Sequence, residues 1–254
     1  MFEQQEKWSD LLNEAVREPG LILEAYTAFH NYSVGNQVAA MVQCVHRGLT
    51  PGPINTYKGW LSLGRQVKKG ERALWLCMPF KRKGDGGEGD EVEVITSFAW
   101  KRKWFILSQT EGEPIEPVQS PDWNKARALA ALNITETPFT GTDGNVQGYA
   151  KGREVSISPI AAMPHKTLFH EIAHVELGHT AESDFTDSEV TPRSLREAEA
   201  EAVALLVCES LELPGTEYSR GYMQTWLRGD VIPEKSAMKI FGAADRILKA
   251  GQAE

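Results

Sequence analysis

The stretch TLFHEIAHVELGHT, residues Thr167 to Thr180, decides how the rest of the chain is interpreted. At its centre His170 and His174 stand four residues apart, a spacing that puts both side chains on one face of an α-helix. Two imidazoles placed in this way can share one Zn²⁺ at roughly 2.0–2.1 Å each, and Glu171 beside them can act as general base. The flanking residues are apolar, so the helix is expected to be buried. The alternative is a chance match, because HExxH also occurs in unrelated proteins.

A third ligand is expected downstream, in SLREAEAEAVALLVCESLEL (194–213), whose pattern is strongly helical. This stretch carries Glu197, Glu199 and Glu201. On a helical wheel Glu197 and Glu201 lie about 40° apart and share their face with small residues, whereas Glu199 points to nearly the opposite side. We therefore predict Glu197 as the third metal ligand and Glu201 as an acceptor for the N–H of a ligand histidine. Glu199 is interpreted as a solvated helix residue.

The predicted ligand set leaves one position open. Two histidines, one glutamate and a site for water are typical of catalytic zinc and not of closed structural sites. We therefore expect Zn²⁺ as cofactor, with Mn²⁺ or Co²⁺ as alternatives, and Glu171 as the catalytic base. His179 follows His174 by five residues, which does not match the spacing HExxHxxGxxH, so it is interpreted as a helix-end residue.

The composition is that of a soluble globular protein, with 41% hydrophobic and 24% charged residues in 254. No apolar run approaches the roughly 20 residues that a membrane-spanning helix needs, and the first ten residues are too polar for a signal peptide. We therefore expect a cytoplasmic protein without a membrane partner. The three cysteines are widely spaced in apolar sequence and are interpreted as buried thiols.

Charge is distributed unevenly along the chain. Residues 1–112 hold 14 Lys and Arg against 13 Asp and Glu, a net charge of +1, whereas residues 113–254 have a net charge of −9. Between them, residues 108–122 contain three prolines and little apolar bulk, as interdomain linkers do. We expect an α+β protein with an N-terminal α/β domain over 1–112, a linker over 113–121 and a mostly helical domain over 122–254.

The N-terminal half combines basic clusters with aromatic residues, the combination that single-stranded nucleic acid binding requires. Cations follow the phosphates and rings accept stacked bases, so the expected partner is single-stranded DNA. The alternative is that the rings form a core and the lysines are merely solvated. The candidate residues are Tyr32, Asn36, Gln37, Tyr57, Lys58, Trp60, Arg65, Lys68, Lys69, Lys101 and Lys103.

Several stretches resemble those of the ArdC-type plasmid antirestriction proteins. In the first half they are YSVGNQ (32–37), TYKGW with LGRQVKKGE (56–71) and WFILSQTEG (104–112), which are similar to that family's single-stranded-DNA-binding domain. In the second half, the HExxH stretch, REAEAEAVALLVC (196–208) and YSRGYMQTW (218–226) resemble its zincin-like metallopeptidase domain, of the gluzincin type HExxH…E. The resemblance spans nearly the whole chain in the same order.

The resemblance implies His170 and His174 as ligands, Glu171 as catalytic residue and a helix glutamate as third ligand, without choosing among the three candidates. It also implies a bacterial plasmid or phage origin and protection of incoming DNA from restriction. We therefore expect an antirestriction protein that binds single-stranded DNA and carries a zinc peptidase site. One alternative is a regulatory metalloprotease that cleaves a protein partner and uses DNA only for localisation. Another is a DNA-binding shield whose metal site is not catalytic.

Overall fold

The computed structural model describes residues 6–83, 94–116, 120–141, 145–180 and 192–253. Its helices and strands divide into two compact units, one of residues 39–118 and one of residues 6–38 with 119–254. The helices are α1 (Trp8–Arg17), α2 (Leu21–Phe29), α3 (Val34–Arg47), α4 (Tyr57–Ser62), α5 (Lys125–Ala131), α6 (Pro164–Glu176), α7 (Arg193–Ser210), α8 (Thr216–Trp226) and α9 (Glu234–Gly251). The strands are β1 (Ile54–Thr56), β2 (Arg65–Val67), β3 (Leu74–Lys83), β4 (Val94–Ile106), β5 (Thr110–Gly112), β6 (Thr135–Glu136), β7 (Gly148–Lys151) and β8 (Glu154–Ile157).

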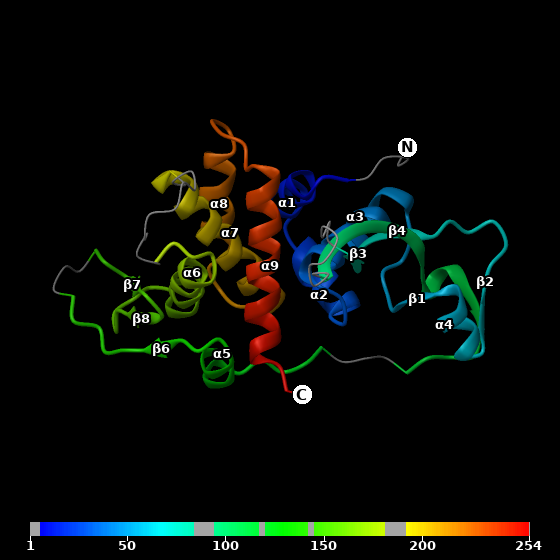
Figure 1. Cartoon of the computed structure of the whole chain (residues 1–254), viewed down its shortest axis with the longest axis horizontal. Helices are drawn as coiled ribbons and strands as arrows, with labels where there is room; N and C mark the ends of the chain where they lie inside the picture. The colour runs from blue at the N-terminus through cyan, green and yellow to red at the C-terminus, as the bar shows by residue number, and fades with distance from the viewer. Residues whose placement is uncertain (1–5, 84–93, 117–119, 142–144, 181–191, 254) are drawn as a thin grey trace, which may run out of the picture. The chain divides into compact units, whose positions relative to one another are not determined.

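The unit of residues 39–118 is built on a long antiparallel pair, β3 and β4, which run side by side in Figure 1. Strand β1 joins the other edge of β4, which gives the order β1-β4-β3, and β2 pairs with β5 in a separate two-stranded sheet. The core side chains alternate along the strands, as expected for a sheet with one buried face. They are Leu74 and Leu76 of β3 and Trp104 and Ile106 of β4, and Trp60 of α4 joins them in the core.

The side-chain amides of two glutamines form hydrogen bonds with backbone N–H and carbonyl groups of this unit. Gln43 on α3 accepts from the N–H of Trp75 and donates to its carbonyl, both at 2.9 Å, and so takes the place of a further strand at the edge of β3. Gln109 accepts from the N–H of Ile106 at 3.0 Å and donates to the carbonyl of Arg72 at 3.0 Å. Buried backbone groups need such partners.

The second unit is mostly helical and is organised around α7. Every residue of α7 from Ala198 to Ser210 is buried, and α7 packs against α2, α6, α8 and α9. Figure 1 shows α6 beside the small sheet of order β6-β8-β7, which it contacts through β7 and β8. Strand β7 lies at one edge of that sheet. The arrangement puts α6 between the sheet and the central helix.

Helices α1 and α2 belong to this helical unit, which differs from the predicted boundaries of 1–112 and 122–254. The physical reason is burial: α1 and α2 place their apolar faces against α7, α8 and α9. Buried Arg220 on α8 forms an ion pair with Glu209 on α7 and donates to the carbonyls of Ala15 and Val16 at the end of α1. The predicted linker, 113–121, lies partly outside the described residues.

Helices and sheets together give the mixed architecture that the sequence predicts. The basic cluster Lys101–Lys103 lies within strand β4. The three cysteines are free and buried, as expected. Among the described helices, none combines the length and the apolar character that a membrane span requires.

Candidate functional site

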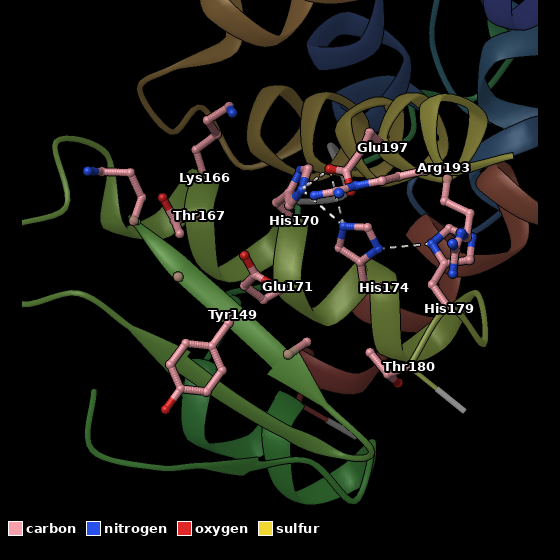
Figure 2. Close-up of a pocket in the computed structure, with 14 residues that line it drawn as sticks. Tyr149, Lys166, Thr167, His170, Glu171, His174, His179, Thr180, Arg193 and Glu197 are labelled. Carbon is pink, nitrogen blue, oxygen red and sulfur yellow. Dashed lines mark hydrogen bonds and ion pairs between the residues drawn. The ribbon is translucent and has the colours of Figure 1, made fainter. Parts of the chain in front are cut away.

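Helix α6 directs its two histidines to one point. The helix begins at Pro164, where the missing proline N–H costs nothing because first-turn donors have no helical partner. Its apolar side is buried, and the opposite side carries His170 and His174 one turn apart. Their Nε2 atoms lie 3.1 Å from each other, and Figure 2 shows both rings at the wall of the same pocket.

Glu197 approaches the histidines from α7. Its Oε2 lies 3.4 Å from Nε2 of His170 and 3.7 Å from Nε2 of His174. The ligand atoms of the three residues all lie within 4.8 Å of one another. Ligands at 2.0–2.1 Å from a tetrahedral ion are separated by roughly 3.3 Å, so this donor set fits a single divalent cation. Water or a substrate oxygen could take the fourth position.

The other ring nitrogen of His170 is held by Glu201. Nδ1 of His170 lies 2.9 Å from Oε2 of Glu201, and Lys166 forms an ion pair with the other carboxylate oxygen at 2.7 Å. A carboxylate that accepts from Nδ1–H leaves Nε2 free of a proton and fixes the orientation of the ring. Glu201 therefore lies where it can orient His170 toward a metal.

His174 is held through a relay of two further residues. Its Nδ1 lies 3.0 Å from Nδ1 of His179, whose Nε2 lies 2.8 Å from Oε2 of Glu199. With His174 donating to His179 and His179 donating to Glu199, Nε2 of His174 is free to bind a cation. The side chain of Glu199 is buried, since the residue is only 2% exposed. The interpretation of Glu199 as a solvated helix residue is therefore wrong.

Glu171 lies in the pocket beside strand β7 (Figure 2). Burial, with a smaller contribution from Glu197, raises its pKa to about 7, while His170 lowers it. Gly148 of β7 permits this proximity, because a Cβ at that position would lie 2.7 Å from Cγ2 of Thr167 and 3.2 Å from Cγ of Glu171. A carboxylate with a pKa near neutrality is suited to accept and return a proton.

The carboxylates of α7 stabilise positive charge at the histidine pair. Burial lowers the pKa of His170, but hydrogen bonds to Glu197 and Glu201 outweigh it and raise the pKa to about 9. Burial lowers the pKa of His174 to about 4, with a further contribution from the charge of His170. The surroundings thus favour positive charge where the two rings and Glu197 meet, and a divalent cation would supply it there.

The site opens into a cavity of about 770 Å³. Its walls come from β7, from α6 and from the first turns of α7. Beside the histidines and glutamates, the lining includes Tyr149, Thr167, Thr180, Arg193 and Arg196. A volume of this size accommodates a short peptide segment or a small ligand.

Some of the predicted DNA-binding residues are accessible. Tyr57, Lys58, Lys69, Lys101 and Lys103 are exposed in the unit of residues 39–118. Lys68 is exposed as well, and its Nζ donates to the carbonyl of Ser108 at 3.0 Å.

Other predicted DNA-binding residues have structural roles. Trp60 is 1% exposed and its Nε1 donates to the carbonyl of Phe105 at 2.8 Å, so its ring is part of the core. Arg65 donates to the side chain of Thr110 at 2.8 Å and to backbone carbonyls of β5 and Glu113.

The residues predicted from the stretch 32–37 lie in the helical unit. Asn36 and Gln37 are buried, and Gln37 donates to the carbonyl of Tyr32 at 2.7 Å. Burial leaves neither amide exposed to a ligand.

The sequence analysis does not predict several residues that the structure places at the candidate sites. Phe80 and Phe98 are exposed on the β3–β4 pair, although aromatic strand residues are usually core residues. At the metal centre the sequence pattern predicts neither the His179–Glu199 relay nor Arg193 and Arg196 as pocket residues. The signal for Arg193 is its spacing of four residues from Glu197, which places both on one helix face, and Arg196 directly precedes Glu197.

Comparison with known proteins agrees with this architecture. Residues 3–103 match the family model of the N-terminal domain of anti-restriction factor ArdC. The metal-free structure of antirestriction protein ArdC from plasmid R388 is 21% identical with a TM-score of 0.57, and the alignment covers 96% of this chain and 94% of that one. Its Mn(II)-bound structure is 20% identical with a TM-score of 0.56, covering 97% and 98%. No curated protein sequence matches the chain. The N-terminal part therefore matches the ArdC family model, and the chain shares the fold of the solved ArdC structures along nearly its whole length.

Proposed function

We propose that this protein is an antirestriction factor that binds single-stranded DNA through residues 39–118 and carries a zincin-like, metal-dependent peptidase centre in its helical unit. The observation that carries the proposal is the convergence of His170, His174 and Glu197, with ligand atoms within 4.8 Å, beside the carboxylate of Glu171. Such a protein would act in the cytoplasm, where incoming DNA meets restriction enzymes. The Mn(II)-bound relative supports a divalent metal, and the donor set suits Zn²⁺.

The chain's own residues would divide the work of peptide hydrolysis. A bound metal would polarise the scissile carbonyl and lower the pKa of water. Glu171, with a pKa of about 7, accepts the proton of the attacking water and returns it to the leaving amine. Glu201 and the His179–Glu199 relay keep the ligand histidines in orientation.

The position of strand β7 supports the proposal that the substrate is a peptide. It is an edge strand, so backbone groups on its outer side have no strand partner among the described residues. Gly148, Tyr149 and Ala150 of this strand line the pocket that contains Glu171. An extended peptide can pair with such an edge, and the pairing would lay its backbone across the metal centre.

The DNA-binding part of the proposal is supported by the β3–β4 pair. Nζ of Lys101 lies 5.9 Å from the ring centroid of Phe80, which is 41% exposed. Phe98 is 61% exposed on the same pair of strands. Exposed rings among cations offer stacking surfaces and phosphate contacts together. Residues 39–118 also hold 12 Lys and Arg against 9 Asp and Glu, whereas the chain as a whole has a net charge of −8.

The test compares Glu171→Gln with His170→Ala in cells that contain a restriction system and receive unmodified DNA. A peptidase mechanism predicts that both variants lose protection, although Glu171→Gln retains one equivalent of metal. A DNA-binding shield with a non-catalytic metal site predicts that Glu171→Gln protects as well as the wild type. A regulatory protease that uses DNA only for localisation predicts that variants of the β3–β4 surface still cleave the protein partner.

A further inference from the structure

Two arginines stand beside the proposed metal centre. Arg193 and Arg196 lie on the first turns of α7, three residues apart, and both line the cavity that contains the histidines. Glu197 lies four residues after Arg193, so these two side chains are neighbours on the helix. Figure 2 shows Arg193 on the wall that carries Glu197. A ligand on the metal would therefore have guanidinium groups close to it.

Neither guanidinium group forms an ion pair or a hydrogen bond with any residue that the structure describes. Nε of Arg196 is buried and has no partner in the described part of the chain. Other arginines of the helical unit are engaged: Arg153 and Arg246 with Glu176, and Arg220 with Glu209. A buried donor without an acceptor is costly, so the site is complementary to an acceptor that comes from outside these residues.

The charge of Arg193 acts on Glu197, but neither arginine forms an ion pair with a described carboxylate of the cavity. Lys166 is paired with Glu201, and Glu171 and Glu197 face the histidine pair. A guanidinium group presents a planar fork of donors that matches a carboxylate in two parallel hydrogen bonds. The acceptor that fits best is therefore an anionic group held a short distance from the metal-bound atoms.

We propose that Arg193 and Arg196 form an anion subsite that selects peptide substrates with a carboxylate next to the scissile bond. The inference rests on the proposed peptidase centre and adds the class of substrate to it. The carboxylate can be an acidic side chain or the C-terminus of the peptide. In either case the guanidinium pair holds the charged end while the scissile carbonyl lies at the histidines.

The test uses two matched ligands on the metal-loaded full chain. One series consists of monohydroxamates of dicarboxylic acids with two to four methylenes, and the other of the same compounds with the free carboxylate converted to a primary amide. Both hydroxamates bind a metal, and only the first can bind the arginines as an anion. At the best spacer length, calorimetry should show the carboxylate binding at least about 10-fold more tightly, as charge-assisted hydrogen bonds do.

The double variant Arg193→Gln with Arg196→Gln should lose this preference while binding the amide as tightly as the wild type, which also shows that fold and metal are intact. Lys151→Gln, at an exposed basic position of β7 outside the cavity lining, is the matched control and should keep the preference. Equal affinity of both ligands for the wild-type chain would overturn the subsite and leave the metal centre standing. Failure of both ligands to bind would overturn the metal centre itself.

Competition separates the sources of the anion. The first competitor is an acetylated, C-terminally amidated tetrapeptide with one internal Asp, and the second is a tetrapeptide with a free C-terminus and no acidic residue. The one that displaces the hydroxamate more strongly identifies the source. If neither peptide competes and a short oligonucleotide does, the arginines bind a nucleic acid phosphate and the proposal is wrong.

Discussion

Glu201 and Glu199 each hold one histidine of the proposed metal centre, Glu201 directly and Glu199 through His179. We predict that Glu201→Gln and Glu199→Gln each lower metal affinity by about 10–100-fold, as the loss of groups that orient ligand histidines does. Competition with a chromophoric chelator measures this. Glu217→Gln, at an exposed position on α8, is the control and should bind like the wild type. If both α7 variants bind the metal as tightly as the wild type, the histidines do not need these two carboxylates to orient them.

Glu6 gives the stability of the chain a pH dependence. Both carboxylate oxygens are buried and lack hydrogen-bond partners among the described residues. Burial, together with the charges of Asp10 and Glu14, raises the pKa of Glu6 to about 7. The unfolded chain ionises this group from about pH 4.5, whereas the folded chain keeps it protonated to about pH 7. Stability should therefore fall as pH rises between these values and level off above them.

Glu6→Gln should remove that loss, so the variant should melt at a higher temperature than the wild type at pH 8. At pH 4 the two should melt alike. Thermal unfolding followed by circular dichroism at both pH values measures the effect. Glu18→Gln, an exposed change just after α1, should leave the pH profile unaltered. If the melting temperature of Glu6→Gln depends on pH in the same way as that of the wild type, Glu6 is not the cause of the pH dependence.

At the scale of single elements, α8 is tied to α1 and α7 by one buried side chain. Arg220 pairs with Glu209 and donates to Ala15 and Val16 at the end of α1. Arg220→Ala leaves a buried carboxylate without its partner, so we predict a loss of roughly 3–5 kcal/mol in the free energy of unfolding. Arg228→Ala, an exposed arginine just after α8, should cost little. Chemical denaturation measures the free energy of unfolding of both variants. Equal losses would show that the buried Arg220–Glu209 pair contributes no more to stability than an exposed arginine does.

A separate prediction concerns the affinity of the β3–β4 pair for DNA. Lys101→Ala should flatten the dependence of log affinity for an oligo-dT on log salt by about 0.7, one phosphate contact's worth. Phe98→Ala should weaken binding by ~1–3 kcal/mol and leave that slope alone, because stacking releases no counterion. Tyr218→Ala removes an exposed ring from α8 and should be silent. If both strand variants bind like the wild type, the DNA surface lies elsewhere.

The helix of the HExxH stretch and the glutamates of α7 show what periodicity can predict. Spacing alone places His170 and His174 on one face, and the wheel puts Glu197 and Glu201 on the side that meets them. The wheel fails for Glu199 because its partner comes from outside a regular helix. Gly178, at φ +78°, turns the chain after α6 and brings His179 back beside His174. A helical wheel describes positions within one helix, so it cannot predict a contact that depends on the turn after the helix.

The aromatic and polar residues of the N-terminal half show that composition alone does not predict which side chains are buried. An aromatic ring in a basic stretch can be core or surface, and only packing decides. Trp60 enters the core because its indole N–H meets the carbonyl of Phe105, while Phe98 remains outside. Whether α1 and α2 belong to one unit or the other is likewise decided by the apolar partners on α7, α8 and α9, far away in sequence.

At the scale of the whole molecule, the two proposed activities belong to separate compact units. DNA affinity should therefore be independent of the metal. We predict that removing the metal with a chelator changes the dissociation constant for oligo-dT by less than about twofold, while the Lys101→Ala effect persists in the metal-free chain. Fluorescence anisotropy measures both. A large loss of DNA affinity on chelation would show that the metal centre and the DNA surface are coupled.

An anomalous difference map from crystals of the full chain grown with Zn²⁺ or Mn²⁺ would show directly which residues hold the metal. We predict one ion bound by Nε2 of His170, Nε2 of His174 and the carboxylate of Glu197 at about 2.0–2.2 Å, with Glu171 near it but not bound. An ion whose ligands exclude Glu197, or a strongest metal peak away from these three residues, would contradict this prediction.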